Sequence, residues 1–114
     1  PWFGHGFGTP LLIKLSEIPY PFHDPHNLTL AVLFDGGVVG LFAWIVVYAT
    51  AFSVIWKCRE HPWAIICSAT VVYGLVAGMT EGGSFLSRPK EHWFLIWIPL
   101  ALVAAIPARN MDHA

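Results

Sequence analysis

Three apolar stretches alternate with short polar segments along this sequence. Residues 36–56 contain no formally charged side chain, residues 62–80 form a second uncharged run, and residues 93–108 form a third that Pro99 interrupts. About 20 apolar helical residues cross a hydrocarbon core of ~30 Å, because an α-helix rises 1.5 Å per residue. The pattern predicts an all-α membrane protein with about three transmembrane helices, over about 28–56, 62–80 and 92–108.

The first 27 residues differ, because glycine and proline are interleaved there with aromatic and histidine side chains. The apolar patch at 11–13 is far too short to span a membrane. Residues 1–27 are therefore predicted to form an extramembrane loop, and residues 28–114 the membrane part.

The start of the first helix is predicted from four adjacent residues. Asp24 is a good N-cap, and Pro25 suits the first helical position, where its missing N–H costs nothing. His26 and Asn27 would then lie in the first turn, beside the positive end of the helix dipole. That end disfavours imidazolium and attracts anions such as phosphate, so a potential base and a potential anion site coincide.

Composition supports a membrane protein. The chain is 56% hydrophobic and 11% charged, with six tryptophans and a mean hydropathy of +0.61. The net charge of −1 and the lack of a basic stripe argue against nucleic acid as a partner. Cys58 and Cys67 are nine residues apart, about 13 Å along one helix, so both are expected to be free thiols. The chain begins without Met or a basic leader, and it is expected to be a piece of a longer polytopic protein.

Small residues recur at a spacing that lets membrane helices pack closely. The pairs are Gly36 with Gly40, Gly74 with Gly78, and Ala101 with Ala105. Three spans put 1–27 and 81–92 on one side, but Lys and Arg residues are equal in number on the two sides and leave the orientation open.

His26 is the first candidate for chemistry. A neutral imidazole at a water-accessible helix start can act as a general base, although a loop histidine that binds backbone carbonyls has the same sequence position. His23 and His26, together with Asp24, could instead hold a metal. No further ligand is evident beyond His5 or Glu17, so no metal is expected.

Three further charged residues are expected at or near the side of the membrane on which His26 lies. Asp35 lies inside the first predicted span, where an ionisable group faces a bundle interior or a water-filled cavity and has either a structural or a catalytic role. Arg88 and Lys90 follow the second span and could bind a phosphate, or they could anchor the chain at the interface beside Trp93. No nucleotide loop or nucleophile elbow is present.

At this point the residues resemble a known family. His26-Asn27, nine further residues and then Gly37-Val38-Val39-Gly40 match the His-[Asn/Ser/Gln]-x9-Gly-x-x-Gly pattern of O-antigen ligases. The upstream segment from Trp2 to Gly8 resembles the Gly-x-Gly-x-Gly segment of that family, and Asp35 matches its acidic residue before the glycines. The Thr-Trp of some members is Ala43-Trp44 here.

The resemblance implies the C-terminal part of a bacterial inner-membrane glycosyltransferase. Such enzymes move a glycan from undecaprenyl diphosphate to an acceptor hydroxyl without a metal or other cofactor. It implies that residues 1–27 end a periplasmic loop and that His26 acts on the acceptor hydroxyl. Asn27, Arg88 and Lys90 are expected to bind substrate, the last two because of their position after the second span. Asp35, Gly37 and Gly40 would shape or line the cavity. The fragment alone is expected to be inactive, because the family's arginines lie upstream.

Several alternatives stay open from the sequence. The expected acceptor is lipid A-core, but an O-antigen polymerase would use the growing glycan, and a protein O-oligosaccharyltransferase a Ser or Thr side chain. A non-catalytic transport or assembly subunit in which His26 and Asp35 only line a cavity is a further alternative, as is a metal-binding loop.

Overall fold

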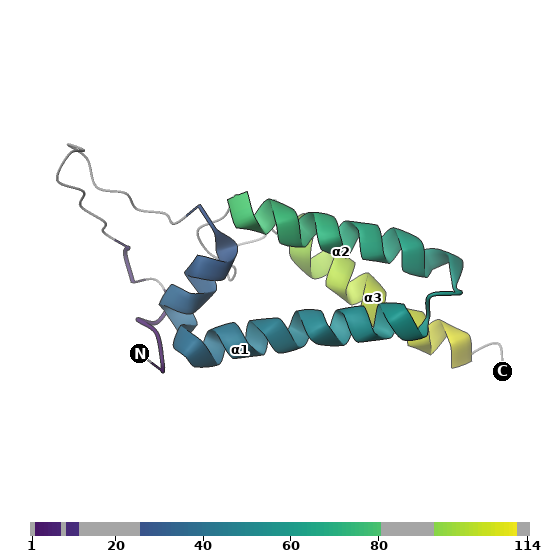
Figure 1. Ribbon diagram of the computed structural model, residues 1–114, viewed down its shortest axis with the longest axis horizontal. Helices are drawn as coiled ribbons and strands as arrows, with labels where there is room; N and C mark the ends of the chain where they lie inside the picture. Colours follow the sequence, from purple (N-terminus) through teal and green to yellow (C-terminus); the bar gives the residue numbers. More distant parts are fainter. Residues whose placement is uncertain (1, 8, 12–25, 81–92, 112–114) are drawn as a thin grey trace.

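The computed structural model describes residues 2–7, 9–11, 26–80 and 93–111, with the side chains of all of these except Trp93 and residues 107–111. Helix α1 covers Leu28–Lys57, and helix α2 covers Pro62–Thr80. A short π-helix, η1, covers Trp93–Trp97 and continues directly into α3, Ile98–Met111. The described residues contain no strand, and α2 and α3 lie against α1 as Figure 1 shows.

The protein is an all-α membrane protein, as predicted. Helices α1 and α2 are long and apolar enough to cross a membrane, whereas the third apolar helix, Phe94–Ile106, is shorter. Their outward faces are apolar too, since Phe42, Ile45 and Ile65 are all more than half exposed. A helix that is apolar all round is typical of a protein whose outer surface meets lipid or further helices.

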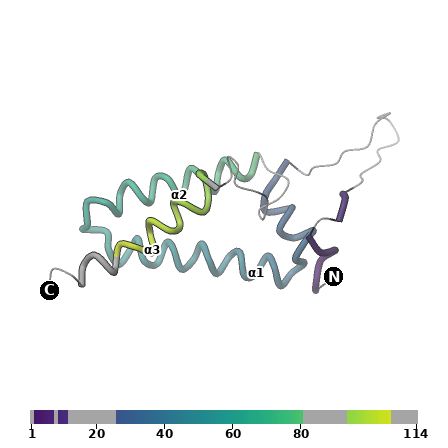
Figure 2. The backbone as a smooth tube through the Cα atoms, turned by 180° about the vertical axis from the view of Figure 1, so that it is seen from behind, coloured from purple at the N-terminus to yellow at the C-terminus, as the bar shows by residue number. Residues whose placement is uncertain are grey.

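Helix α1 bends sharply at Gly37, whose φ of 64° and ψ of −159° lie outside the helical region. The part before the bend leans towards the C-terminal end of α2, and the part after it runs along the bundle (Figures 1 and 2). The later part, 38–57, rises about 30 Å, enough to cross the hydrocarbon core.

The three helices pack through faces that repeat every three or four residues, as one side of a helix must. Helix α1 contributes Trp44, Tyr48 and Ala51, and α2 contributes Cys67 and Val71. The third element contributes Ile96, Val103 and Ile106. The Trp44 ring meets Tyr48 and Trp97 edge-on, with centroids 5.0 and 6.4 Å away, so this tryptophan joins α1 to η1.

One of the three small-residue pairs packs helices as predicted. A Cβ on Gly74 would overlap the carbonyl of Leu95, and a Cβ on Gly78 would lie 3.4 Å from Leu28. Pro99 lies four residues after Leu95 and has no N–H to donate to the Leu95 carbonyl, so this carbonyl lacks its usual helical partner where it meets Gly74.

The other two pairs make no close helix contact among the described residues. Gly36 has open space beside it, and Ala101 and Ala105 are exposed. Gly40 faces its own helix, because a Cβ there would lie 3.3 Å from the carbonyl oxygen of Val32 across the bend. Gly40 therefore leaves room on the inside of the bend.

Candidate functional site

Helix α1 begins three residues later than the capping pattern predicted. Asn27, not Asp24, is the N-cap, with an extended backbone (φ −152°, ψ 113°), and Leu28 is the first helical residue. His26 therefore precedes the helix instead of lying in its first turn. It is exposed and has a φ of 45°, in the left-handed region that few residues other than glycine adopt. Asp24 and Pro25 lie outside the described residues.

The side chain of Asn27 joins two helix ends. Its Oδ1 accepts a hydrogen bond from the Leu30 N–H at 3.0 Å, which caps α1, and its Nδ2 donates to the Met79 carbonyl at 3.0 Å. Met79 lies in the last turn of α2, where carbonyls lack a partner within the helix. Leu28, only 2% exposed, packs beside Gly78 next to this bond. The N-terminal end of α1, which we call its mouth, is thus fixed to the C-terminal end of α2.

A second contact is made by residues 2–6, which we call the glycine strap. The strap lies against the bend of α1, as the two views of the N-terminal segment show (Figures 1 and 2). His5 N donates to Phe34 O at 2.8 Å, and Gly6 N donates to Asp35 O at 3.0 Å. In return, the N–H of Val39 donates to Trp2 O at 3.2 Å.

These three bonds replace those that the bend removes. In an unbroken helix, Asp35 O would accept a hydrogen bond from Val39 N, and Phe34 O would accept one from Val38 N. The conformation of Gly37 breaks that ladder, and unpaired backbone groups are costly wherever water is excluded. The strap supplies two donors and one acceptor, and so allows a broken helix in a membrane protein.

The glycines of the two motifs are the positions where this contact is tightest. A Cβ on Gly4 would lie 2.6 Å from Asp35 O, and a Cβ on Gly37 would lie 2.5 Å from both Gly4 N and Trp2 O. Gly6, like Gly37, has a positive φ, of 84°. The Gly-x-Gly and Gly-x-x-Gly patterns therefore serve one structure, a strap on a bend.

His5 adds side-chain contacts to the strap. Its ring stacks on that of Phe34, with centroids 4.4 Å apart and planes inclined by 14°, and its Nδ1 lies 3.3 Å from Phe34 O. Thr9 Oγ1 donates to the His5 carbonyl at 2.7 Å. The strap is therefore held by ring stacking as well as by backbone bonds.

Of the predicted site residues, the structure brings Asp35, Gly37 and Gly40 together at the bend. Asp35 is half-buried there, and its backbone is held by the strap. Arg88, Lys90, His23 and Glu17 lie outside the described residues. Among the residues that are described, no three His, Cys, Asp or Glu side chains meet in a way that could hold a metal. Cys58 and Cys67 are free thiols.

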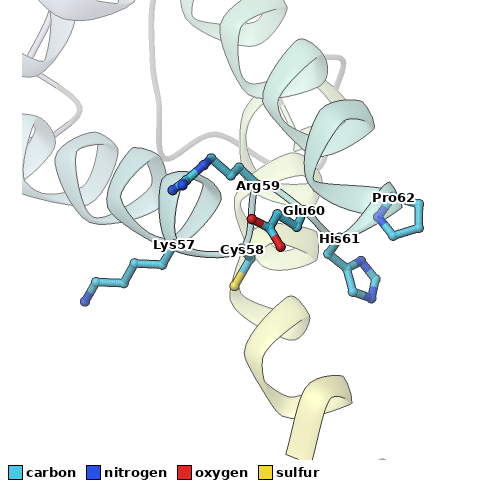
Figure 3. Close-up of a pocket in the computed structure, with 6 residues that line it drawn as sticks. All are labelled: Lys57, Cys58, Arg59, Glu60, His61 and Pro62. Carbon is cyan, nitrogen blue, oxygen red and sulfur yellow. The ribbon is translucent and has the colours of Figure 1, made fainter.

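The other end of the bundle has an open pocket of about 480 Å³ around the α1–α2 turn. Figure 3 shows its lining residues, and in it Lys57 and His61 project to opposite sides. The bonds here are local, with His61 N donating to Cys58 O at 2.9 Å and Trp63 N donating to His61 Nδ1 at 3.3 Å.

Two features of the site were missed from the sequence. The bond from Asn27 to Met79 joins residues 52 positions apart, and no local pattern announces it. The strap was recognised as a glycine motif, but its partner was not. A signal did exist, because Gly36-Gly37 directly follows Asp35 inside an apolar span, and glycines are common at helix bends.

These features define a class of protein, an α-helical membrane protein whose extramembrane segment closes a break in a spanning helix. Over 106 residues the chain is 53% identical to an O-antigen ligase of Pseudomonas aeruginosa strain PAO1, an alignment that covers 93% of this chain. The chain belongs to the O-antigen ligase superfamily. It spans about a quarter (26%) of the length of that relative, as a C-terminal fragment. No family model and no solved structure matches.

Proposed function

We propose that this chain is the C-terminal part of a glycosyltransferase that moves a glycan from undecaprenyl diphosphate to an acceptor hydroxyl, with lipid A-core as the acceptor. The observation that carries the proposal is the 53% identity to an O-antigen ligase over nearly the whole chain. The exposed position of His26 at the mouth of α1 supports it further. The protein would lie in the bacterial inner membrane with residues 1–27 facing the periplasm.

In this mechanism a neutral His26 accepts the proton of the acceptor hydroxyl. The hydroxyl oxygen then attacks the anomeric carbon of the donor glycan, and the bond from that carbon to the diphosphate oxygen breaks. Undecaprenyl diphosphate leaves with the electron pair. General-base catalysis of this kind contributes about 10²- to 10⁴-fold.

The leaving diphosphate needs positive groups near it, because its charge grows as the bond breaks. Arg88 and Lys90 follow α2 within ten residues of Thr80, and α2 ends beside the mouth of α1. We assign these two side chains to binding the diphosphate, a role for which the proposal requires no metal ion. The upstream part of the protein would supply further cations, so the 114-residue chain alone should not transfer glycan.

The test is His26→Ala in the full-length protein, with His61→Ala as the matched control at the far end of the bundle. We expect the first variant to lose transfer by at least about 100-fold while its amount in the membrane stays normal, and the second to keep it. Transfer is read as glycan-capped lipid A-core on gels. Unchanged transfer by His26→Ala would refute the assignment of His26 as the general base. In a separate experiment, single-repeat products in a knockout of the full-length protein would indicate a polymerase instead of a ligase.

A further inference from the structure

We propose that Asn27 is a positioning residue, whose side-chain amide fixes His26 by joining the start of α1 to the end of α2. This inference rests on the proposed function, because it assigns the role through which Asn27 serves the base. It differs from a substrate-binding role, in which the amide would turn towards the donor or the acceptor.

The first argument is that both ends of the amide are used by the fold. The acceptor, Oδ1, is bonded to Leu30 N, and the donor, Nδ2, is bonded to Met79 O, each at 3.0 Å. A helix N-terminus has free donors and a helix C-terminus has free acceptors. An amide carries one group of each kind, so Asn27 satisfies a free donor of α1 and a free acceptor of α2 at once.

The second argument is the short distance along the chain from Asn27 to His26. His26 has a left-handed backbone and Asn27 an extended one, so the two residues form a turn into the helix. Such a conformation persists only where its surroundings hold it. The Asn27 bonds and the packing of Leu28 beside Gly78 hold the residues that directly follow His26.

The third argument is what this anchoring achieves. Met79 is the penultimate residue of α2, and the segment with Arg88 and Lys90 follows it. Fixing α1 to this point sets the position of the base relative to the end of α2. A misplacement of about 1 Å in such an arrangement can cost about 100-fold in rate.

The test compares three variants in the full-length protein. Asn27→Asp keeps an oxygen that caps α1 but turns the donor to Met79 O into an acceptor, so it breaks the link and spares the cap. Asn27→Ala removes both bonds. Thr80→Ala is the control, because it removes a local bond to Ala77 O in the same last turn of α2 without touching α1.

Transfer is measured in membranes at varied donor and acceptor concentrations, together with the amount and melting temperature of each variant. We expect Asn27→Asp to lower kcat at least tenfold with both KM values within about twofold, and to lower the melting temperature less than Asn27→Ala does, because the cap of α1 is kept. Asn27→Ala should lose the same activity and also stability, and Thr80→Ala should match the wild type.

Three outcomes would overturn the inference, and each is distinct from failure of the proposed function. A wild-type kcat for Asn27→Asp, beside an inactive His26→Ala, would show that the link is dispensable. A raised KM with unchanged kcat would indicate substrate binding. A loss of activity in proportion to lost protein would indicate a purely structural residue. The proposed function itself fails only if His26→Ala is active.

Discussion

The two ends of this helical bundle are held together by different means. At the His26 end, bonds join residues far apart in the sequence, with Asn27 bonded to Met79 and His5 to Phe34. At the other end, the α1–α2 turn is held by bonds between residues two to four positions apart, such as Cys58 N to Val54 O. The structure of the α1–α2 turn is therefore determined by its local sequence, whereas the structure of the His26 end depends on the whole fold.

The contrast also bears on function. A turn held by local bonds keeps its shape however the helices shift, whereas the His26 end exists only when the strap, α1 and α2 are all in place. Broken backbone ladders are tolerated in membrane proteins where other groups satisfy them. Variants that attack long-range contacts should therefore have larger effects than variants at the turn.

The largest effect is expected for Gly37→Ala. Alanine in this backbone conformation, which is essentially restricted to glycine, costs about 1–3 kcal/mol, and its Cβ would displace Trp2 and Gly4 of the strap. Losing strap bonds adds about 1 kcal/mol each. We expect a total loss of about 2–4 kcal/mol, measured as thermal unfolding of the detergent-solubilised full-length protein, with loss of glycan transfer.

Gly36→Ala is the neighbouring control for this prediction. Gly36 has helical geometry and open space beside it, so alanine should be neutral or stabilise the helix by up to about 1 kcal/mol. Equal destabilisation by both substitutions would mean that the bend does not depend on the conformation of Gly37, and the role assigned to the strap would be wrong.

The same contrast explains how far the sequence could predict this molecule. Apolar runs predicted the C-terminal end of α1 to within a residue and both ends of α2, because helix length and polar ends are local properties. The helix start was misplaced because Asp24 and Asn27 are both good caps, and the choice of Asn27 involves a carbonyl 52 residues away. The contact of the strap with α1 could not be predicted for the same reason, because a glycine motif does not indicate which distant residues its glycines contact.

A smaller effect is expected for His5→Ala, which tests the strap through a side chain. The substitution removes the ring that stacks on Phe34 at 4.4 Å and leaves the backbone bond from His5 N to Phe34 O in place. Aromatic pairs contribute about 0.5–1.5 kcal/mol, so we expect a loss of about 1 kcal/mol in the same unfolding measurement. His5→Phe should recover most of it. If both variants lose equally, the contact from Nδ1 and not the stacking holds the strap.

The smallest effect is expected at the turn, for Arg59→Ala. The Arg59 guanidinium lies 5.3 Å from the centre of the Trp56 ring and donates to Trp56 O at 3.3 Å, but Arg59 and Trp56 are both exposed. An exposed contact of this kind is worth about 0.5–1 kcal/mol at most. The substitution should therefore lower stability by about 0.5 kcal/mol, since the turn keeps its backbone bonds, and it should leave glycan transfer unchanged. A loss as large as that of His5→Ala would mean that the turn depends on its side chains as much as the strap does, and the distinction between the two ends would fail.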